Sequence, residues 1–87
     1  MESYKIQIKP SASKELELIG NKRDRQRIVT RIQKLADNPR PPGCEKLESN
    51  EDKYRVRQGR YRVVYSIDDQ RRLVIIIKIG HRREVYR

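Results

Sequence analysis

Residues 54–65 have the sequence YRVRQGRYRVVY, in which apolar and basic side chains alternate on both sides of Gly59. This period of two predicts two strands joined at the glycine. Because successive strand side chains point to opposite faces, Tyr54 and Val56 share one face, and after the turn Tyr61, Val63 and Tyr65 continue it. The opposite face takes four arginines, Arg55, Arg57, Arg60 and Arg62. The stretch therefore predicts a β-hairpin with one apolar face and one strongly basic face.

The first half of the chain predicts one strand and two helices. Residues 4–8 alternate apolar and polar side chains, as in a half-buried strand. Pro10 suits the first turn of a helix, where its missing N–H is not needed, and Gly20 ends this helix. Asn21 predicts the N-cap of a second helix, which stops at residues 37–39. We expect the two helices to form an antiparallel hairpin on a sheet.

The second half of the chain predicts the sheet. Residues 45–47 are expected to form a short strand ahead of the 54–65 hairpin. Residues 73–79 are apolar on both faces, which predicts a central strand buried on both sides, and Gly80 ends it. The expected fold is α+β, with an N-terminal strand and a two-helix hairpin packed on an antiparallel C-terminal sheet. All of residues 1–87 fit one domain.

Composition limits the classes of partner and the compartment. The 87 residues include 39% charged residues and carry a net charge of +10, which attracts nucleic acid, anionic membranes or acidic proteins. Cys44 is the only cysteine, so neither an intrachain disulfide nor a cysteine zinc site is available. The apolar run 73–77 is far shorter than the roughly 20 residues that span a bilayer. We expect a cytoplasmic protein with no membrane partner.

The four arginines of the hairpin allow two interpretations. Charged residues on the outer face of a half-exposed sheet are often only solvated. Like charges on neighbouring strands repel each other, however, and a polyanionic ligand relieves that repulsion. Arginine also suits phosphate, because its planar guanidinium makes bidentate, permanently charged contacts.

The segment after Gly80 holds a second group of candidate residues. His81 is the only histidine, and it is either an ordinary surface residue or a group that transfers protons. Arg82, Arg83 and Tyr86 follow within five residues, and Tyr86 either closes the edge of the core or contacts a ligand. The other tyrosines are expected to be structural: Tyr4, Tyr54, Tyr61 and Tyr65.

The sequence lacks the common cofactor and nucleophile motifs. It has no phosphate-binding loop, no glycine-rich dinucleotide turn and no nucleophile–base pair. The acidic residues at 48–52 and 68–69 do not have the spacing of metal ligands. An enzyme with this sequence is expected to work without a metal or an organic cofactor.

Residues 54–65, together with 74–80 and the ending GHRREVY at 80–86, resemble the RelE branch of the RelE/ParE toxin superfamily. The opening strand, Pro10 and the second helix also fit, so the resemblance covers nearly the whole chain. The resemblance implies a type II toxin that enters the ribosomal A site and cuts mRNA, and a cognate antitoxin that blocks it. In this family the substrate's own 2′-OH attacks the adjacent phosphate and leaves a 2′,3′-cyclic phosphate.

The resemblance also assigns roles by position. Arg55 and Arg57 stand where the family often has lysines, and Arg62 stands at its phosphate-contacting arginine. Tyr86 stands at the family's C-terminal tyrosine, and residues 81–83 cover the segment with its catalytic basic residue; which of the three aligns stays open.

The arginines on the hairpin are a departure from the family pattern. A lysine with a lowered pKa accepts a proton, but arginine stays protonated to above about pH 12. Arg55, Arg57 and Arg62 are therefore expected to hold and neutralise the phosphate, with Arg60 as a further RNA contact. Arg62 is expected on the exposed polar face, so its truncation is expected to cost the fold little.

Proton transfer in the implied cleavage reaction is assigned to residues of the C-terminal segment. Histidine has an unperturbed pKa of about 6.5, so His81 is the first candidate for proton transfer, and we expect it on the same face as the arginines. Arg82 or Arg83 would assist it, Arg83 would also bind RNA, and Tyr86 would orient or stack on a base.

Two other classes of function are consistent with the sequence. A ParE-like protein shares the fold and inhibits DNA gyrase by binding, without catalysis. A plain RNA-binding module would bind with a steep salt dependence and leave the RNA uncut.

Overall fold

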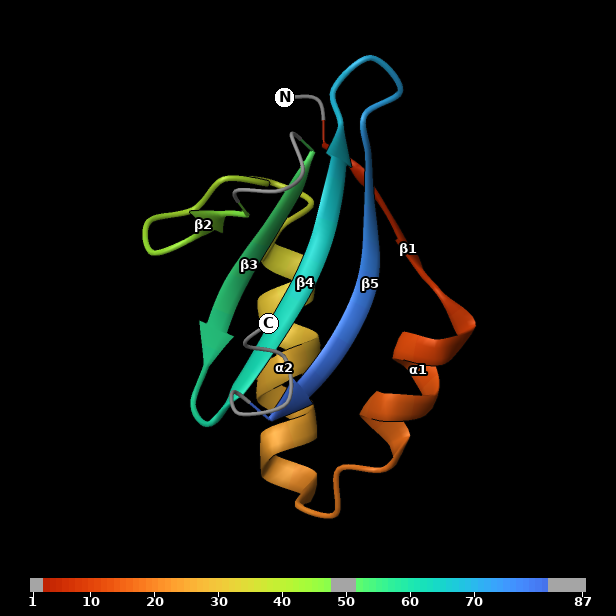
Figure 1. Cartoon of the computed structure of the whole chain (residues 1–87), viewed down its shortest axis with the longest axis vertical. Helices are drawn as coiled ribbons and strands as arrows, with labels where there is room; N and C mark the ends of the chain where they lie inside the picture. The colour runs from red at the N-terminus through yellow and green to blue at the C-terminus, as the bar shows by residue number, and fades with distance from the viewer. Residues whose placement is uncertain (1–2, 48–51, 82–87) are drawn as a thin grey trace.

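A computed structural model describes residues 3–47 and 52–81 of the chain. Five strands and two helices follow one another along these residues (Figure 1). In chain order they are β1 (Lys5–Ile8), α1 (Pro10–Glu17), α2 (Lys22–Lys34), β2 (Glu45–Lys46), β3 (Lys53–Gln58), β4 (Tyr61–Asp68) and β5 (Leu73–His81).

The strands form a single sheet in the order β1-β5-β4-β3-β2. The pairs from β2 to β5 are antiparallel, and the expected α+β fold of strand, two helices and antiparallel sheet is confirmed. β1 alone pairs in parallel, with Lys5 opposite Leu73 and Ile8 opposite Ile76 on β5. The first and last strands of the described chain therefore lie side by side.

Both helices begin where the sequence predicts. Pro10 occupies the first turn of α1, and the Asn21 side chain accepts a hydrogen bond from the Asp24 backbone N–H at 3.1 Å. α1 packs against β5, whereas α2 crosses behind the strands in Figure 1 and contacts β3. Neither helix among the described residues is long and apolar enough to cross a membrane.

One apolar core lies between the sheet and the helices. Its fully covered side chains include Ile28 and Leu35 from the α2 side and Val63, Tyr65 and Ile76 from the sheet. The expectation that β5 is buried on both faces is wrong in part. β5 is an inner strand, but Leu73, Ile75 and Ile77 are only half-buried, because the helices cover just one face of the sheet.

A tight turn sets the register of the hairpin. Gln58 pairs with Tyr61, which leaves Gly59 and Arg60 as a two-residue loop. Gly59 has a φ of +60°, and Arg60 does not share this left-handed conformation, as a type II′ turn requires. From this turn the register continues without a break and places Arg57 opposite Arg62.

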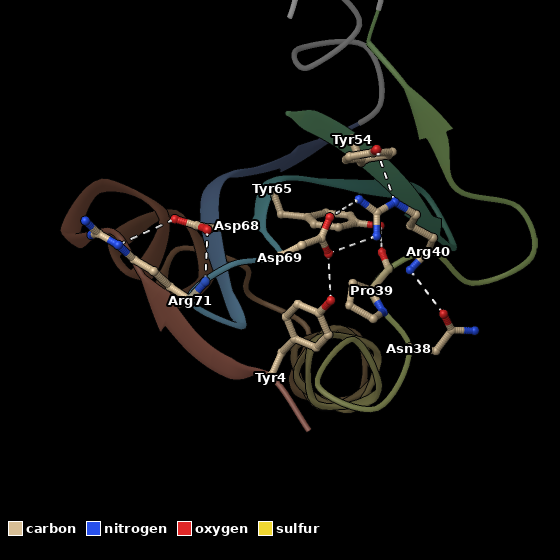
Figure 2. A network of polar contacts seen from close by, with 9 residues as sticks. All are labelled: Tyr4, Asn38, Pro39, Arg40, Tyr54, Tyr65, Asp68, Asp69 and Arg71. Atoms are coloured by element: carbon tan, nitrogen blue, oxygen red, sulfur yellow. Dashed lines mark hydrogen bonds and ion pairs between the residues drawn. The ribbon is translucent and has the colours of Figure 1, made fainter. Parts of the chain in front are cut away.

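A polar network closes the other end of the sheet (Figure 2). The buried Tyr65 hydroxyl donates to the Pro39 carbonyl oxygen at 2.7 Å. Arg40 binds Asp69 through two hydrogen bonds of 2.9 and 3.2 Å, and its Nε donates to the Tyr54 hydroxyl. These contacts fasten the loop after α2 to the sheet. They also confirm a structural role for Tyr54 and Tyr65.

Tyr4 joins the same network from the start of β1. Its hydroxyl donates to Asp69 Oδ1 at 2.6 Å (Figure 2). Its backbone N–H donates to the Ala36 carbonyl at 2.8 Å. The hydrogen bonds from Arg40 and from Tyr4 lower the pKa of Asp69, while the bond to Asp69 raises the pKa of Tyr4. The network therefore links β1, the loop after α2 and the β4–β5 turn.

Candidate functional site

Three arginines lie on the face of the sheet that the helices do not cover. Arg57 on β3 is directly opposite Arg62 on β4, and Arg55 is two residues before Arg57 on the same face. We call Arg55, Arg57 and Arg62 the arginine face. No ion pair joins Arg57 to a carboxylate among residues 3–47 and 52–81. Like charges directly opposite on neighbouring strands are destabilising, so this arrangement favours a bound anion.

Arg62 is only 6% exposed. The expectation of an exposed Arg62 is therefore wrong. β4 is the middle strand of the sheet, so neighbouring strands flank Arg62 on both sides, and Val64 beside it on the same face is also buried. The Arg62 side chain is thus covered, whereas Arg57 remains exposed. A fixed cation beside a solvent-exposed one suits binding of a phosphate in a defined position.

Glu45 is a residue of this face that the sequence analysis missed. β2 places it opposite Arg55, and its Oε2 accepts a hydrogen bond from Arg55 at 2.8 Å. The pKa of Glu45 is lowered, first by this hydrogen bond, then by the charge of Arg55 and also by those of Arg62 and Arg57. Glu45 therefore carries a negative charge beside the arginines and orients Arg55. A two-residue strand is too short for a periodic signal, so its pairing partner was not predictable.

Arg60 lies in the β3–β4 turn and is exposed. It stands at the end of the arginine face rather than within the ladder. A phosphate chain that leaves Arg57 and Arg62 toward the turn would reach Arg60 next. The structure thus allows an RNA contact by Arg60 and gives it no packing role.

His81 does not share a face with the arginines. It pairs with Tyr61 at the end of β5, just as Ile79 pairs with the buried Val63, so both aromatic rings turn toward the helices. The two ring centroids are 5.9 Å apart in an edge-on arrangement. The expectation that His81 lies on the same face as the arginines is therefore wrong, because Gly80, and not His81, is the residue of β5 opposite Arg62.

The surroundings of His81 come from α1 and the segment after it. His81 and Tyr61 line a groove of about 380 Å³ together with Glu15 and Gly20. Glu15 accepts hydrogen bonds from the Ile79 backbone N–H and from Lys78 Nζ, each at 3.0 Å. The pairing of β5 with β1 ends at Ile76. Glu15 thus connects α1 to the part of β5 that follows this pairing.

The remaining predicted site residues, Arg82, Arg83 and Tyr86, lie outside the described residues. Within residues 3–47 and 52–81, no three His, Cys, Asp or Glu side chains come together as a metal site. The chemistry that the described residues offer is electrostatic. Three guanidinium groups on one face stabilise negative charge, and one carboxylate orients the first of them.

Comparison with known proteins identifies the family to which the chain belongs. Residues 6–86 match the family described as the ParE toxin of the type II toxin–antitoxin system parDE. A putative RelE-like toxin protein from Escherichia coli is 27% identical over 81 residues, which are 91% of this chain and 83% of that protein. The toxin RelG of Mycobacterium tuberculosis is 41% identical over 34 residues, a match that spans 39% of each chain.

Solved structures agree with this assignment. The archaeal RelE–RelB complex from Pyrococcus horikoshii contains a chain 29% identical to this one, with a TM-score of 0.81 over 92% of this chain and 96% of that chain. The Mycobacterium tuberculosis RelBE2 toxin–antitoxin complex gives 25% identity and a TM-score of 0.79 over 92% and 99% of the two chains. The protein is therefore a RelE-like toxin of a type II toxin–antitoxin system and belongs to the ParE toxin family of the RelE/ParE superfamily.

Proposed function

We propose that the protein is a ribosome-dependent endoribonuclease that cuts mRNA in the ribosomal A site and so inhibits translation. The observation that carries this proposal is the Arg57–Arg62 pair, with Arg55 beside it on the uncovered face of the sheet. A cluster of fixed guanidinium groups is suited to an anionic transition state. The likeness to RelE chains supports the same class of activity.

In the proposed reaction, the 2′-oxygen of one nucleotide attacks the adjacent phosphorus. The O2′–P bond forms and the P–O5′ bond breaks, which leaves a 2′,3′-cyclic phosphate and a free 5′-hydroxyl. Negative charge grows on the phosphoryl oxygens in the transition state, and Arg62 and Arg57 neutralise it there. Arg55, oriented by Glu45, holds the same or the next phosphate.

One proton must leave the 2′-hydroxyl and one must reach O5′. The arginines stay protonated near neutral pH and are poor bases. His81 is the one histidine of the sequence, but its ring packs on Tyr61 on the opposite face of the sheet. We therefore assign the base that deprotonates the 2′-hydroxyl to a group that the ribosome supplies, and we propose that Arg82, Arg83 or Tyr86 stabilises or protonates the departing O5′. Among the described residues, the arginine face holds no strong base, which favours dependence on the ribosome.

We further propose that an acidic antitoxin neutralises the protein. Two of the solved relatives are chains of toxin–antitoxin complexes, RelBE2 and the archaeal RelE–RelB complex. The net charge of +10 on 87 residues would steer an acidic, partly disordered partner toward the toxin.

Gyrase inhibition is the second candidate function, because the matching family carries the name of the ParE toxin. A protein that inhibits gyrase by binding does not need cations paired across a ladder on an open face. The two candidates thus differ in what they require of Arg57 and Arg62.

One experiment separates the candidates. Purified protein is added to a translation extract, the mRNA ends are mapped, and gyrase supercoiling is measured with the same protein. We expect new mRNA ends inside codons at the A site, none on the same RNA without ribosomes, and normal supercoiling. Uncut mRNA with lost supercoiling would establish gyrase inhibition instead. RNA that is bound but left uncut, together with normal supercoiling, would identify a plain RNA-binding module.

A further inference from the structure

A second cationic surface lies on α2, away from the arginine face. Arg23, Arg27, Arg31 and Lys34 share one side of this helix and line a groove of about 440 Å³, which Gln58 at the end of β3 completes. Three of the four side chains are exposed, and Arg31 is half-buried. In the described part of the chain, no ion pair joins any of the four to a carboxylate. We call these four residues with Gln58 the α2 groove.

Of this row of charges, only Arg31 and Lys34 in the last turn of α2 are placed favourably for the helix itself. Like charges four residues apart on a helix destabilise it, and Arg23, Arg27 and Arg31 have this spacing. From Arg23 to Lys34 the row extends over roughly 16 Å at 1.5 Å per residue. In addition, Arg31 Nε is buried without a hydrogen-bond partner among the described residues. A long polyanion laid along α2 would offset the repulsion.

The lining of the α2 groove selects the kind of polyanion. Besides the four cations, its described lining consists of amide and hydroxyl side chains, from Gln26, Thr30 and Gln58. Proteins hold single-stranded RNA by stacking bases on aromatic rings, and no aromatic ring is among the described residues of the groove. Double-helical RNA is instead held through phosphates and 2′-hydroxyls, which are contacts that Arg, Lys, Gln and Thr make.

A protein partner fits a different surface. Leu16 of α1 and Val29 of α2 line a larger groove, which adjoins the α2 groove at Gln26 and Thr30. An amphipathic helix buries apolar anchors when it docks, so it would use that larger groove. The described lining of the α2 groove offers no such anchor.

We propose that the α2 groove binds the sugar–phosphate backbone of a double-helical RNA segment, which in the ribosome is ribosomal RNA. This last identification rests on the proposed endonuclease function, whereas the RNA contact does not. Gln58 of the α2 groove follows Arg57 of the arginine face directly along β3. Among the described residues, β2 pairs only with Tyr54 and Arg55, so the edge of β3 at Arg57 and Gln58 is unpaired and lies between the two cationic surfaces. RNA thus meets the domain on both sides of β3, with substrate on the outer face and structural RNA along α2.

The test compares two triple variants that each remove three exposed positive charges. R23Q/R27Q/K34Q alters the α2 groove and keeps Arg31, whereas K5Q/K9Q/K14Q alters β1 and the α1 region. Glutamine preserves helix propensity. The probes are a labelled RNA duplex of about 16 base pairs and ribosomes carrying an mRNA with 2′-O-methylated A-site nucleotides, which cannot be cut. Affinity is measured over a series of salt concentrations, and circular dichroism checks the fold of both variants.

We expect R23Q/R27Q/K34Q to weaken binding of both probes by roughly tenfold or more, and to lower the salt slope by about one per lost contact. K5Q/K9Q/K14Q should bind nearly as the parent does. Equal loss in both variants, or parental binding by R23Q/R27Q/K34Q, would overturn the proposal. So would a variant that binds RNA normally but escapes the antitoxin. If the parent binds the duplex through this groove yet cuts no mRNA, the groove assignment stands and the endonuclease proposal fails.

Discussion

Arg57 and Arg62 lie directly opposite each other in the β3–β4 ladder, yet Arg57 is exposed and Arg62 is 6% exposed. The same chemical group therefore stands in two environments on one face. Arg62 is a buried cation, whereas Arg57 adds a second charge at the surface. Substitutions at the two positions should separate stability from activity.

Arg57→Gln should lower mRNA cleavage without destabilising the protein. Removing one of two like charges that face each other across a ladder should leave the free energy of unfolding unchanged or raise it by up to about 1 kcal/mol. Urea unfolding and single-turnover cleavage on the ribosome measure the two effects. A variant that unfolds more easily than the parent would show that Arg57 makes a stabilising contact.

Arg62→Ala should lower both the free energy of unfolding and the rate of mRNA cleavage. Truncating a buried side chain is expected to cost about 1–3 kcal/mol of the free energy of unfolding, and loss of a charge contact in the transition state costs roughly 10²-fold or more in rate. Cleavage must therefore be measured at a temperature where the variant is folded by circular dichroism. Parental cleavage by folded Arg62→Ala would exclude Arg62 from the site, and Arg71→Ala, at an exposed arginine in the β4–β5 turn, is the control.

His81→Gln should reduce single-turnover cleavage by less than tenfold. General acid–base catalysis is worth about 10²–10⁴-fold, but the His81 ring packs against Tyr61 on the face opposite the arginines. The pH profile of cleavage should also keep its shape in this variant. A loss of 100-fold, with disappearance of a titration near neutrality, would return the proton to His81.

Glu45→Gln tests the link between Glu45 and Arg55. The pKa of Glu45 lies below its ordinary value of 4.5, chiefly because Arg55 donates a hydrogen bond to it. A carboxylate with a lower pKa in the folded state stabilises the protein above its unfolded pKa, and this stabilisation is lost as the pH falls through the folded pKa. The parent should therefore be slightly more stable than Glu45→Gln at neutral pH, and the difference should vanish in acid. A difference that is independent of pH would contradict the ionised pair.

Tyr65→Phe should destabilise the protein and leave its cleavage rate unchanged once folded. The change removes the donor to the Pro39 carbonyl and leaves a buried acceptor unsatisfied, which costs about 1–3 kcal/mol. Tyr54→Phe is the matched control, because its hydroxyl only accepts from the partly exposed Arg40 and should cost less. The network lies at the end of the sheet away from the β3–β4 turn (Figures 1 and 2). Equal losses of stability in the two variants would show that burial of Tyr65 is unimportant.

Local sequence patterns predicted the elements well, because their signals are local. The alternation around Gly59, Pro10 at a helix start and Asn21 as a cap each depend on a few neighbouring residues. The face of His81 was not predictable in this way. β5 is apolar on both sides, so its pattern does not show which residues turn toward the helices; the pairing with Tyr61 decides it.

The missed features all depend on residues far apart in the chain. Burial of Arg62 follows from the central place of β4, and the pairing of Glu45 with Arg55 comes from a strand of two residues. The groove beside α2 needs Gln58 of β3 next to a helix that ends at Lys34. Composition indicated an anionic partner, but only the fold shows that the cations form two separate surfaces.

The parallel pairing of β1 with β5 bears on how the toxin is made. Lys5 lies near the start of the described chain and pairs with Leu73 near its end, so the sheet is complete only after β5 has been synthesised. Contacts between such distant residues form late, because a long loop must close first. A nascent chain without β5 also leaves one edge of β4, the strand with Arg62, unpaired. A protein proposed to attack ribosomes is therefore expected to reach its active fold only when its synthesis is nearly complete.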